Sequence, residues 1–131
     1  MIDVEAAAAD VIDASLLIHR ELGPGLLESV YETLLAAELT RRGYPVLRQQ
    51  PIDFVFNGMR FDAAFRIDLL VGSKLVVEVK SAERLSGVHA RQLLTYLRLM
   101  QQPLGLLVNF GGETLKEGLK RVVNNHKSFA P

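Results

Sequence analysis

Two short apolar runs, separated by an amphipathic segment, place the tightest limit on the fold of this chain. The runs occupy residues 75–80 (LVVEVK) and 104–110 (LGLLVNF), and residues 86–101 between them repeat apolar side chains at helical spacing. Runs rich in valine and leucine are typical of strands that are buried on both faces. A strand, a helix and a second strand therefore predict a parallel pair joined by a right-handed crossover.

The segments before this unit predict two helices. Residues 3–20 and 26–42 carry apolar side chains at helical spacing, and a Gly-Pro-Gly segment interrupts the pattern between them. Asp3 is a suitable N-cap for the first helix, and Gly43 can end the second in a left-handed conformation. The side of the second helix that we expect to face inward consists of Leu27, Val30, Leu34 and Ala37.

A meander of extended segments follows the helices. Asn57-Gly58 favours a two-residue hairpin turn between residues 46–56 and residues 59–71. Pro51 cannot donate a backbone hydrogen bond, so we expect it on an edge strand or at a bulge. Gly72-Ser73-Lys74 predicts the next turn, after which the first of the two apolar runs begins.

The chain closes with residues 113–124, which predict a last amphipathic helix, and with a tail at 126–131 that we expect to be frayed. We therefore expect one α/β domain over residues 1–131. Its mixed central sheet would join an antiparallel meander to a parallel strand through a crossover helix, with helices on its flanks. The length of 131 residues and the apolar content of 49% are ordinary for one globular domain.

Composition excludes several kinds of site. The chain has no cysteine, which rules out disulfides, thiolate metal sites and cysteine nucleophiles. Its first residues are acidic rather than basic, unlike a secretory signal, and no apolar run approaches the roughly 20 residues of a membrane span. We expect a cytoplasmic protein with no membrane partner. Its 15 basic and 15 acidic residues balance, which argues mildly against strong non-specific binding to nucleic acid.

Three ionisable residues interrupt the apolar strands. Glu78 and Lys80 stand two residues apart on one strand, so they share a face. If the turn at residues 72–74 contains three residues, Asp68 lies opposite Glu78, with Cβ atoms roughly 5 Å apart. Two ionised carboxylates at this distance repel one another, and a divalent cation between them removes the repulsion. A two-residue turn would instead place Asp68 opposite Val77.

The cluster of Asp68, Glu78 and Lys80 suits the chemistry of phosphate esters. Oxygen ligands are typical of Mg²⁺ or Mn²⁺, which polarise a phosphoryl oxygen and lower the pKa of a bound water. Lys80 would stabilise the developing charge or orient the water. For Glu78 and Lys80 alone, a solvated ion pair is the simpler interpretation. Asp68 on a neighbouring apolar strand favours a functional site, because burying three ionisable groups is costly.

These residues resemble a known motif. Asp68 followed by Glu78-Val79-Lys80 is similar to the signature of the PD-(D/E)XK nuclease superfamily. Upstream, GLLESVY at residues 25–31 resembles the signature of the GxxExxY family within that superfamily, and the resemblance extends from residue 19 to 123. It implies a restriction-endonuclease-like core, in agreement with the fold expected above.

The resemblance also implies a role for each site residue. The implied metal ligands are Glu28, Asp68, Glu78 and the carbonyl group of Val79. The implied catalytic residues are Lys80, Glu78, Asp68 and, as support from the crossover helix, Gln92. Tyr96 shares a helix face with Gln92, and this face lines either the site or the boundary between core and solvent. Tyr31 shares a face with Glu28, and we expect it to pack in the core with its hydroxyl group hydrogen-bonded.

The implied function is that of a metal-dependent phosphodiesterase acting on nucleic acid, with DNA expected ahead of RNA. Mg²⁺ or Mn²⁺ would be the cofactor, and a metal-activated water would attack the phosphodiester. The alternative is a catalytically silent nuclease fold that binds nucleic acid or a protein partner. The balanced charge favours this alternative, in which a homodimer or another protein would supply recognition. A third interpretation, an interaction protein with structural ion pairs alone, is disfavoured by the complete set of Glu28, Asp68, Glu78 and Lys80.

Overall fold

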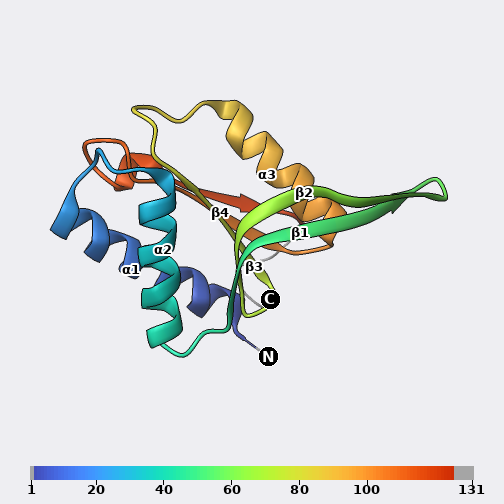
Figure 1. Ribbon diagram of the computed structural model, residues 1–131, viewed down its shortest axis with the longest axis horizontal. Coiled ribbons are helices and arrows are strands. Elements are labelled where there is room, and N and C mark those ends of the chain that lie inside the picture. Colours follow the sequence, from blue (N-terminus) through green and yellow to red (C-terminus); the bar gives the residue numbers. More distant parts are fainter. Residues whose placement is uncertain (1, 126–131) are drawn as a thin grey trace.

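A five-stranded mixed sheet forms the middle of the molecule, and helices pack on both of its faces (Figure 1). The computed structural model describes residues 2–125. In chain order its elements are α1 (Val4–Leu22), α2 (Glu28–Arg41), β1 (Val46–Phe56), β2 (Met59–Val71), β3 (Leu75–Lys80), α3 (Gly87–Met100), β4 (Leu104–Asn109), a 3₁₀ turn (Lys116–Gly118) and β5 (Leu119–Val123). None of the helices within the described residues is long and apolar enough to cross a membrane.

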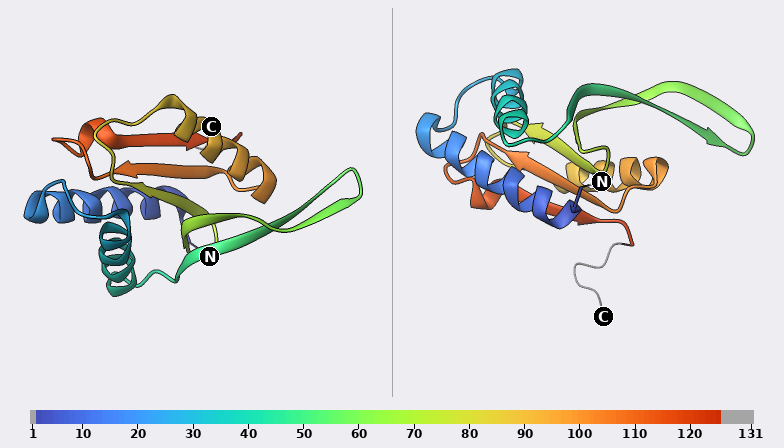
Figure 2. Two further views of the ribbon diagram at one scale, coloured as in Figure 1. Left: turned by 45° about the horizontal axis from the view of Figure 1, so that its top comes forward. Right: turned by 90° about the horizontal axis from the view of Figure 1, so that it is seen from below.

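The strands lie in the sheet in the order in which they occur in the chain. β3 and β4 are parallel and are connected through α3, whereas every other neighbouring pair is antiparallel. This arrangement confirms the α/β class and the mixed sheet that the two apolar runs predict. Alternate residues of β3 divide the core in two: Val77 packs with α1 and α2 on one face, and Val76 packs with α3 on the other (Figure 2).

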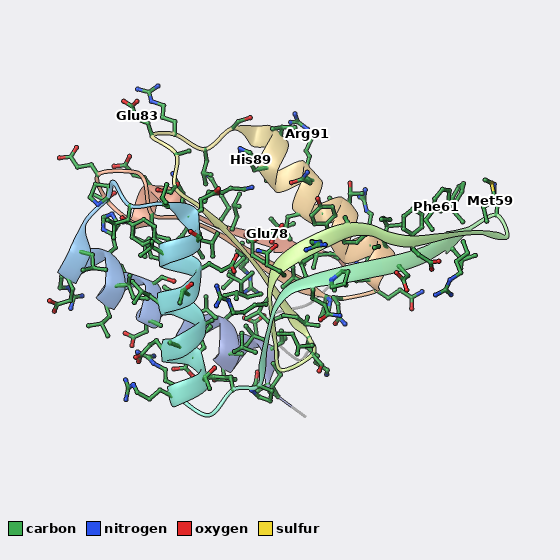
Figure 3. The ribbon with its side chains drawn as sticks, viewed as in Figure 1. Met59, Phe61, Glu78, Glu83, His89 and Arg91 are labelled. Atoms are coloured by element: carbon green, nitrogen blue, oxygen red, sulfur yellow. The ribbon has the colours of Figure 1, made fainter. Side chains whose placement is uncertain are left out.

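β1 and β2 continue beyond the sheet as a two-stranded arm (Figures 1 and 2). The predicted two-residue turn closes it, with Asn57 and Gly58 at φ angles of 50° and 76°. Met59 and Phe61 lie near the tip, where both are exposed (Figure 3). Pro51 lies on β1, an edge strand, as its missing N–H group predicts.

The face that α2 buries differs from the predicted one. Leu27, Val30 and Leu34 of the expected inward stripe are 74%, 39% and 36% exposed, and Ala37 is exposed too. The buried residues are instead Tyr31, Glu32, Leu35, Ala36 and Leu39. Leucine and alanine occur on both sides of this helix, so their spacing does not select a face. The observed face can include the buried carboxylate of Glu32 because Arg48 forms an ion pair with it, as described below.

The predicted helix at residues 113–124 is wrong. A 3₁₀ turn occupies Lys116–Gly118, and β5 then pairs with the outer edge of β4. Leu119 packs against the core under α1 and α2, whereas Val122 packs against the core under α3. Side chains three residues apart reach opposite faces of a strand but neighbouring positions on a helix, so a strand satisfies both cores. The frayed tail expected at 126–131 falls outside the described residues.

Buried Asn109, at the end of β4, fixes the backbone that follows β3. Its side-chain carbonyl accepts the N–H groups of Ala82 and Gly111 at 2.9 and 3.1 Å, and its amide donates to the carbonyl of Ala82 at 2.8 Å. The N–H group of Phe110 donates to the carbonyl of Lys80 at 2.8 Å. The end of β3 is therefore held in place on its β4 side.

Tyr31 fixes the approach to α2. Its ring is fully buried and stacks on Phe110, with centroids 4.5 Å apart. Its hydroxyl group donates to the carbonyl of Gly23 at 2.5 Å and accepts the N–H group of Leu26 at 3.2 Å. The expectation of a core tyrosine with a hydrogen-bonded hydroxyl is confirmed. The same contacts hold the loop that leads to Glu28.

Gly111 offers a test of this packing. A Cβ atom at Gly111 would lie 2.4 Å from the carbonyl oxygen of Ala82, whereas one at Gly112 would meet its nearest atom at 3.5 Å. We expect Gly111→Ala to lower the free energy of unfolding by about 2 kcal/mol or more, because backbone must move. Gly112→Ala is the matched control and should change it by less than about 1 kcal/mol. Urea denaturation measures both, and equal effects would contradict the packing described.

Candidate active site

The register of β2 and β3 places the two motif carboxylates opposite each other. Leu69, Leu70 and Val71 pair with Val77, Val76 and Leu75, and the next pair in this register is Asp68 with Glu78. The turn thus contains three residues, of which Gly72 and Ser73 have φ angles of 58° and 63°. This confirms the arrangement on which the metal-site hypothesis depends.

Side chains replace the backbone ladder where β2 and β3 stop pairing. Oε2 of Glu78 accepts the N–H group of Asp68 at 2.7 Å. In return, Oδ2 of Asp68 accepts the N–H group of Val79 at 2.8 Å. Each carboxylate therefore reaches across to the other strand, which keeps the two acidic groups side by side.

The two carboxylates differ in environment. Glu78 is only 7% exposed, and burial followed by the negative charge of Asp68 raises its pKa from 4.5 to about 8. The N–H group of Asp68 and the charge of Lys80 oppose this rise without cancelling it. Asp68 accepts two N–H donors, from Val79 and from the side chain of Gln49. With its pKa raised to about 8, Glu78 holds a proton near neutral pH when no cation is bound.

A pocket of about 410 Å³ opens beside this pair, between α2 and the strands. The residues that line it are Glu28, Ser29, Glu32, Arg48, Gln49, Asp68, Val79 and Lys80. Among the predicted site residues, Glu28, Asp68, Val79 and Lys80 meet here. Glu78, labelled at the centre of the molecule in Figure 3, joins them through its hydrogen bond with Asp68. Gln92 is exposed on α3 and is not among the lining residues.

Tyr96 of α3 lies near the pair. It is half-buried and stacks on Phe65 with centroids 4.2 Å apart. Burial raises the pKa of its hydroxyl group, and the negative charges of Glu78 and Asp68 raise it further. Tyr96 thus belongs both to the edge of the core and to the surroundings of the carboxylates, so the two interpretations left open by its sequence position are compatible.

Four residues of the pocket were not predicted from the sequence: Ser29, Glu32, Arg48 and Gln49. Buried Glu32 pairs with Arg48 at 3.1 Å and accepts the side-chain amide of Gln49 at 2.7 Å. Glu32 follows Glu28 by four residues, and this spacing on one helix could have indicated it. The spacing did not lead to a prediction for Glu32, because the opposite side of α2 was expected to face inward. Nothing in the sequence around Gln49 indicates its position.

The donor set fits a hard divalent cation. Two adjacent carboxylates and the carbonyl group of Val79 offer oxygen ligands. A cation would offset both the burial and the repulsion by Asp68 that raise the pKa of Glu78. Glu28 lines the same pocket from the first turn of α2. Over residues 2–125, however, no three acidic or histidine side chains are close enough together to form a complete cation site by themselves. Backbone oxygen and water would have to supply further ligands.

Fold and site together define a class of protein: a mixed α/β fold with an acidic pair and a lysine where two neighbouring strands diverge, as in nucleases. A family model described as the PD-(D/E)XK nuclease superfamily matches residues 5–122. The chain belongs to this superfamily. Searches of curated proteins and of solved structures gave no match.

The raised pKa of Glu78 makes stability depend on pH. Between pH 4.5 and about 8 the folded chain retains a proton that the unfolded chain releases, so stability falls as pH rises through this range. Glu78→Gln removes the buried charge. In EDTA we expect this variant to exceed the wild type in unfolding free energy by on the order of 2–4 kcal/mol at pH 9, and by little at pH 5.

Urea denaturation at the two pH values measures this difference. The control is Glu83→Gln, which changes an exposed glutamate on the loop after β3 (Figure 3) and should have little effect at either pH. A Glu78→Gln effect of the same size at pH 5 and pH 9 would show that Glu78 does not retain its proton.

Proposed function

We propose that this chain is a metal-dependent phosphodiesterase that hydrolyses nucleic acid, DNA ahead of RNA. The observation that carries the proposal is the pairing of Asp68 with Glu78 across two diverging strands, beside a pocket that also presents Lys80. Membership of the superfamily supports the same reaction class. We also propose that the chain belongs to the GxxExxY group, since Glu28 lines the pocket and Tyr31 fixes the loop before it.

Each residue of the site has a distinct role in this proposal. Asp68, Glu78 and the carbonyl group of Val79 would hold Mg²⁺ or Mn²⁺. Glu28 would face the ion across the pocket from α2, and water would supply the remaining ligands. When bound, such an ion supplies Lewis acidity at a phosphoryl oxygen and a water of lowered pKa. Lys80, half-buried at the pocket wall, donates to a phosphate oxygen and stabilises the negative charge that develops there.

A silent nuclease fold that binds nucleic acid or a protein partner is the second candidate. The balanced charge of the chain favours its protein-binding form, because binding to the phosphates of nucleic acid depends on lysine and arginine. The position of Glu28 favours a silent fold as well, because Glu28 does not approach the acidic pair closely enough to form a three-carboxylate group within residues 2–125. Cleavage assays separate the two candidates.

Lys80→Ala and Glu78→Ala test the reaction. With Mg²⁺ or Mn²⁺ present, we expect each variant to cleave single- or double-stranded DNA at least about 100-fold more slowly than the wild type, because Lys80→Ala removes a positive charge at the reacting phosphate and Glu78→Ala removes a ligand of the ion. Lys116→Ala is the matched control, since Lys116 is exposed on the 3₁₀ turn. Wild-type protein that binds but does not cleave DNA or RNA would favour the silent module, and cleavage unchanged in both variants would indicate a contaminant.

Metal binding is tested without any substrate. We expect Mn²⁺ to raise the melting temperature of the wild type, since a ligand at 100 times its Kd adds about 2.7 kcal/mol to stability. Asp68→Asn should abolish most of this shift. Asp62→Asn changes a carboxylate on the same strand, in the exposed arm, and should preserve the shift. Equal Mn²⁺ shifts in the two variants would place the metal away from Asp68.

A further inference from the structure

A side-chain network on α2 and β1 reaches Asp68 from outside the nuclease motif. Its members are Gln49, Glu32 and Arg48. We infer that Gln49 is a positioning residue, which fixes the Asp68 carboxylate in the orientation that a divalent cation requires, and that Glu32 and Arg48 hold Gln49 for this purpose. The inference rests on the proposed metal site and identifies residues that tune it.

The amide group of Gln49 lies between two carboxylates. Its Nε2 atom is 2.7 Å from Oε1 of Glu32 and 3.2 Å from Oδ1 of Asp68. Carboxylates only accept hydrogen bonds, so the nitrogen rather than the oxygen of the amide must face them, and each of its two hydrogens has one acceptor. The orientation of this amide is therefore determined by the chemistry of its partners.

Glu32 is a fixed acceptor for this amide. Its carboxylate is 6% exposed, and Oε2 accepts Nε and Nη2 of Arg48 at 3.3 and 3.1 Å. Nη2 of Arg48 also donates to the hydroxyl group of Thr33 at 2.8 Å. A buried carboxylate held by a guanidinium group moves little, so the Gln49 amide that it holds moves little as well.

The backbone of Gln49 supports the same conclusion. Its φ angle is 48°, in the left-handed region that residues other than glycine and asparagine seldom adopt. Gln49 is exposed, so core packing does not impose this conformation. The β1–β2 pairs continue on either side, at Arg48 with Leu69 and Gln50 with Ile67. Ala63 in the arm has the same φ angle, so the angle alone does not indicate a site; at Gln49 it accompanies a side chain that is bonded to Asp68.

The consequence for Asp68 is that both of its oxygens have a donor. Oδ2 accepts the N–H group of Val79 and Oδ1 accepts the amide of Gln49. These bonds restrict rotation of the carboxylate. Groups that orient a metal ligand in this way typically change metal affinity 10- to 100-fold when they are removed.

Calorimetric titration of the full chain with Mn²⁺ alone tests the inference. Gln49→Met keeps the length of the side chain and removes its donors, and Gln49→Asn tolerates the positive φ angle but is one methylene too short. We expect both variants to raise the Kd for Mn²⁺ about tenfold. Gln50→Met is the matched control on the same strand, since the Gln50 amide contacts the carbonyl of Pro51 instead, and it should leave the Kd unchanged.

Urea denaturation of the same variants separates positioning from stability. Because asparagine relieves the backbone strain, we expect Gln49→Asn to unfold at the wild-type urea concentration or above while binding Mn²⁺ more weakly. A merely structural role would lower stability and leave the Kd unchanged. Glu32→Gln should weaken Mn²⁺ binding as well, and combining it with Gln49→Asn should add little, because both act through one network.

Two results would overturn the inference, and they can be told apart. Wild-type Kd values in both Gln49 variants, or an equal loss in Gln50→Met, would remove the positioning role and leave the metal site intact. A wild-type chain that does not bind Mn²⁺ would overturn the proposed metal site itself, and the positioning role with it.

Discussion

The side-by-side carboxylates of Asp68 and Glu78 are the constraint on which the rest of the site depends. Two acidic groups at the edge of an apolar core repel each other and lose hydration, and the raised pKa of Glu78 records both costs. The strands accommodate the pair by ending their ladder at Leu69 and Val77, after which each carboxylate binds the backbone N–H group that the opposite strand leaves free. The two carboxylates can lie side by side because the ladder ends there, and the ladder can end there because the carboxylates bind the N–H groups that it leaves free.

Contacts in the surrounding fold prevent β2 and β3 from separating further. The side chain of Asn109 hydrogen-bonds to the backbone after β3. Phe110, which directly follows β4, stacks on Tyr31, and the hydroxyl group of Tyr31 holds the loop before α2. Glu32 of α2 then contacts β1 through Arg48 and Gln49. Two routes thus connect α2 to the strands, one through stacked rings in the core and one through charged groups at the pocket, so the helix that carries Glu28 has a defined position relative to Asp68.

Sequence reasoning succeeded where a periodic pattern had only one structural solution. The βαβ unit and the turn at Asn57-Gly58 follow from spacing alone, whereas the pairing of Asp68 with Glu78 was one of two alternatives, decided by the three-residue turn that the structure has. It failed where apolar residues satisfied two patterns. Leucines lie on both sides of α2, and the spacing of Leu119 and Val122 suits a helix as well as a strand that serves two cores. Gln49 could not be predicted, because its role depends on a backbone angle and on partners 17 and 19 residues away.

The distribution of charge limits how this chain would bind the nucleic acid that we propose as its substrate. Several arginines already contact acidic side chains of the same chain: Arg41, Arg42, Arg48, Arg60 and Arg121. On the arm, Arg60 faces both Asp53 and Asp62, so that part of β1 and β2 offers little net positive charge to a phosphate backbone. A guanidinium group that is paired with a carboxylate binds a phosphate more weakly, because it must give up its attraction to the carboxylate in order to do so. The arm would therefore contribute little to phosphate binding, whereas at the pocket Lys80 and a bound cation would supply positive charge.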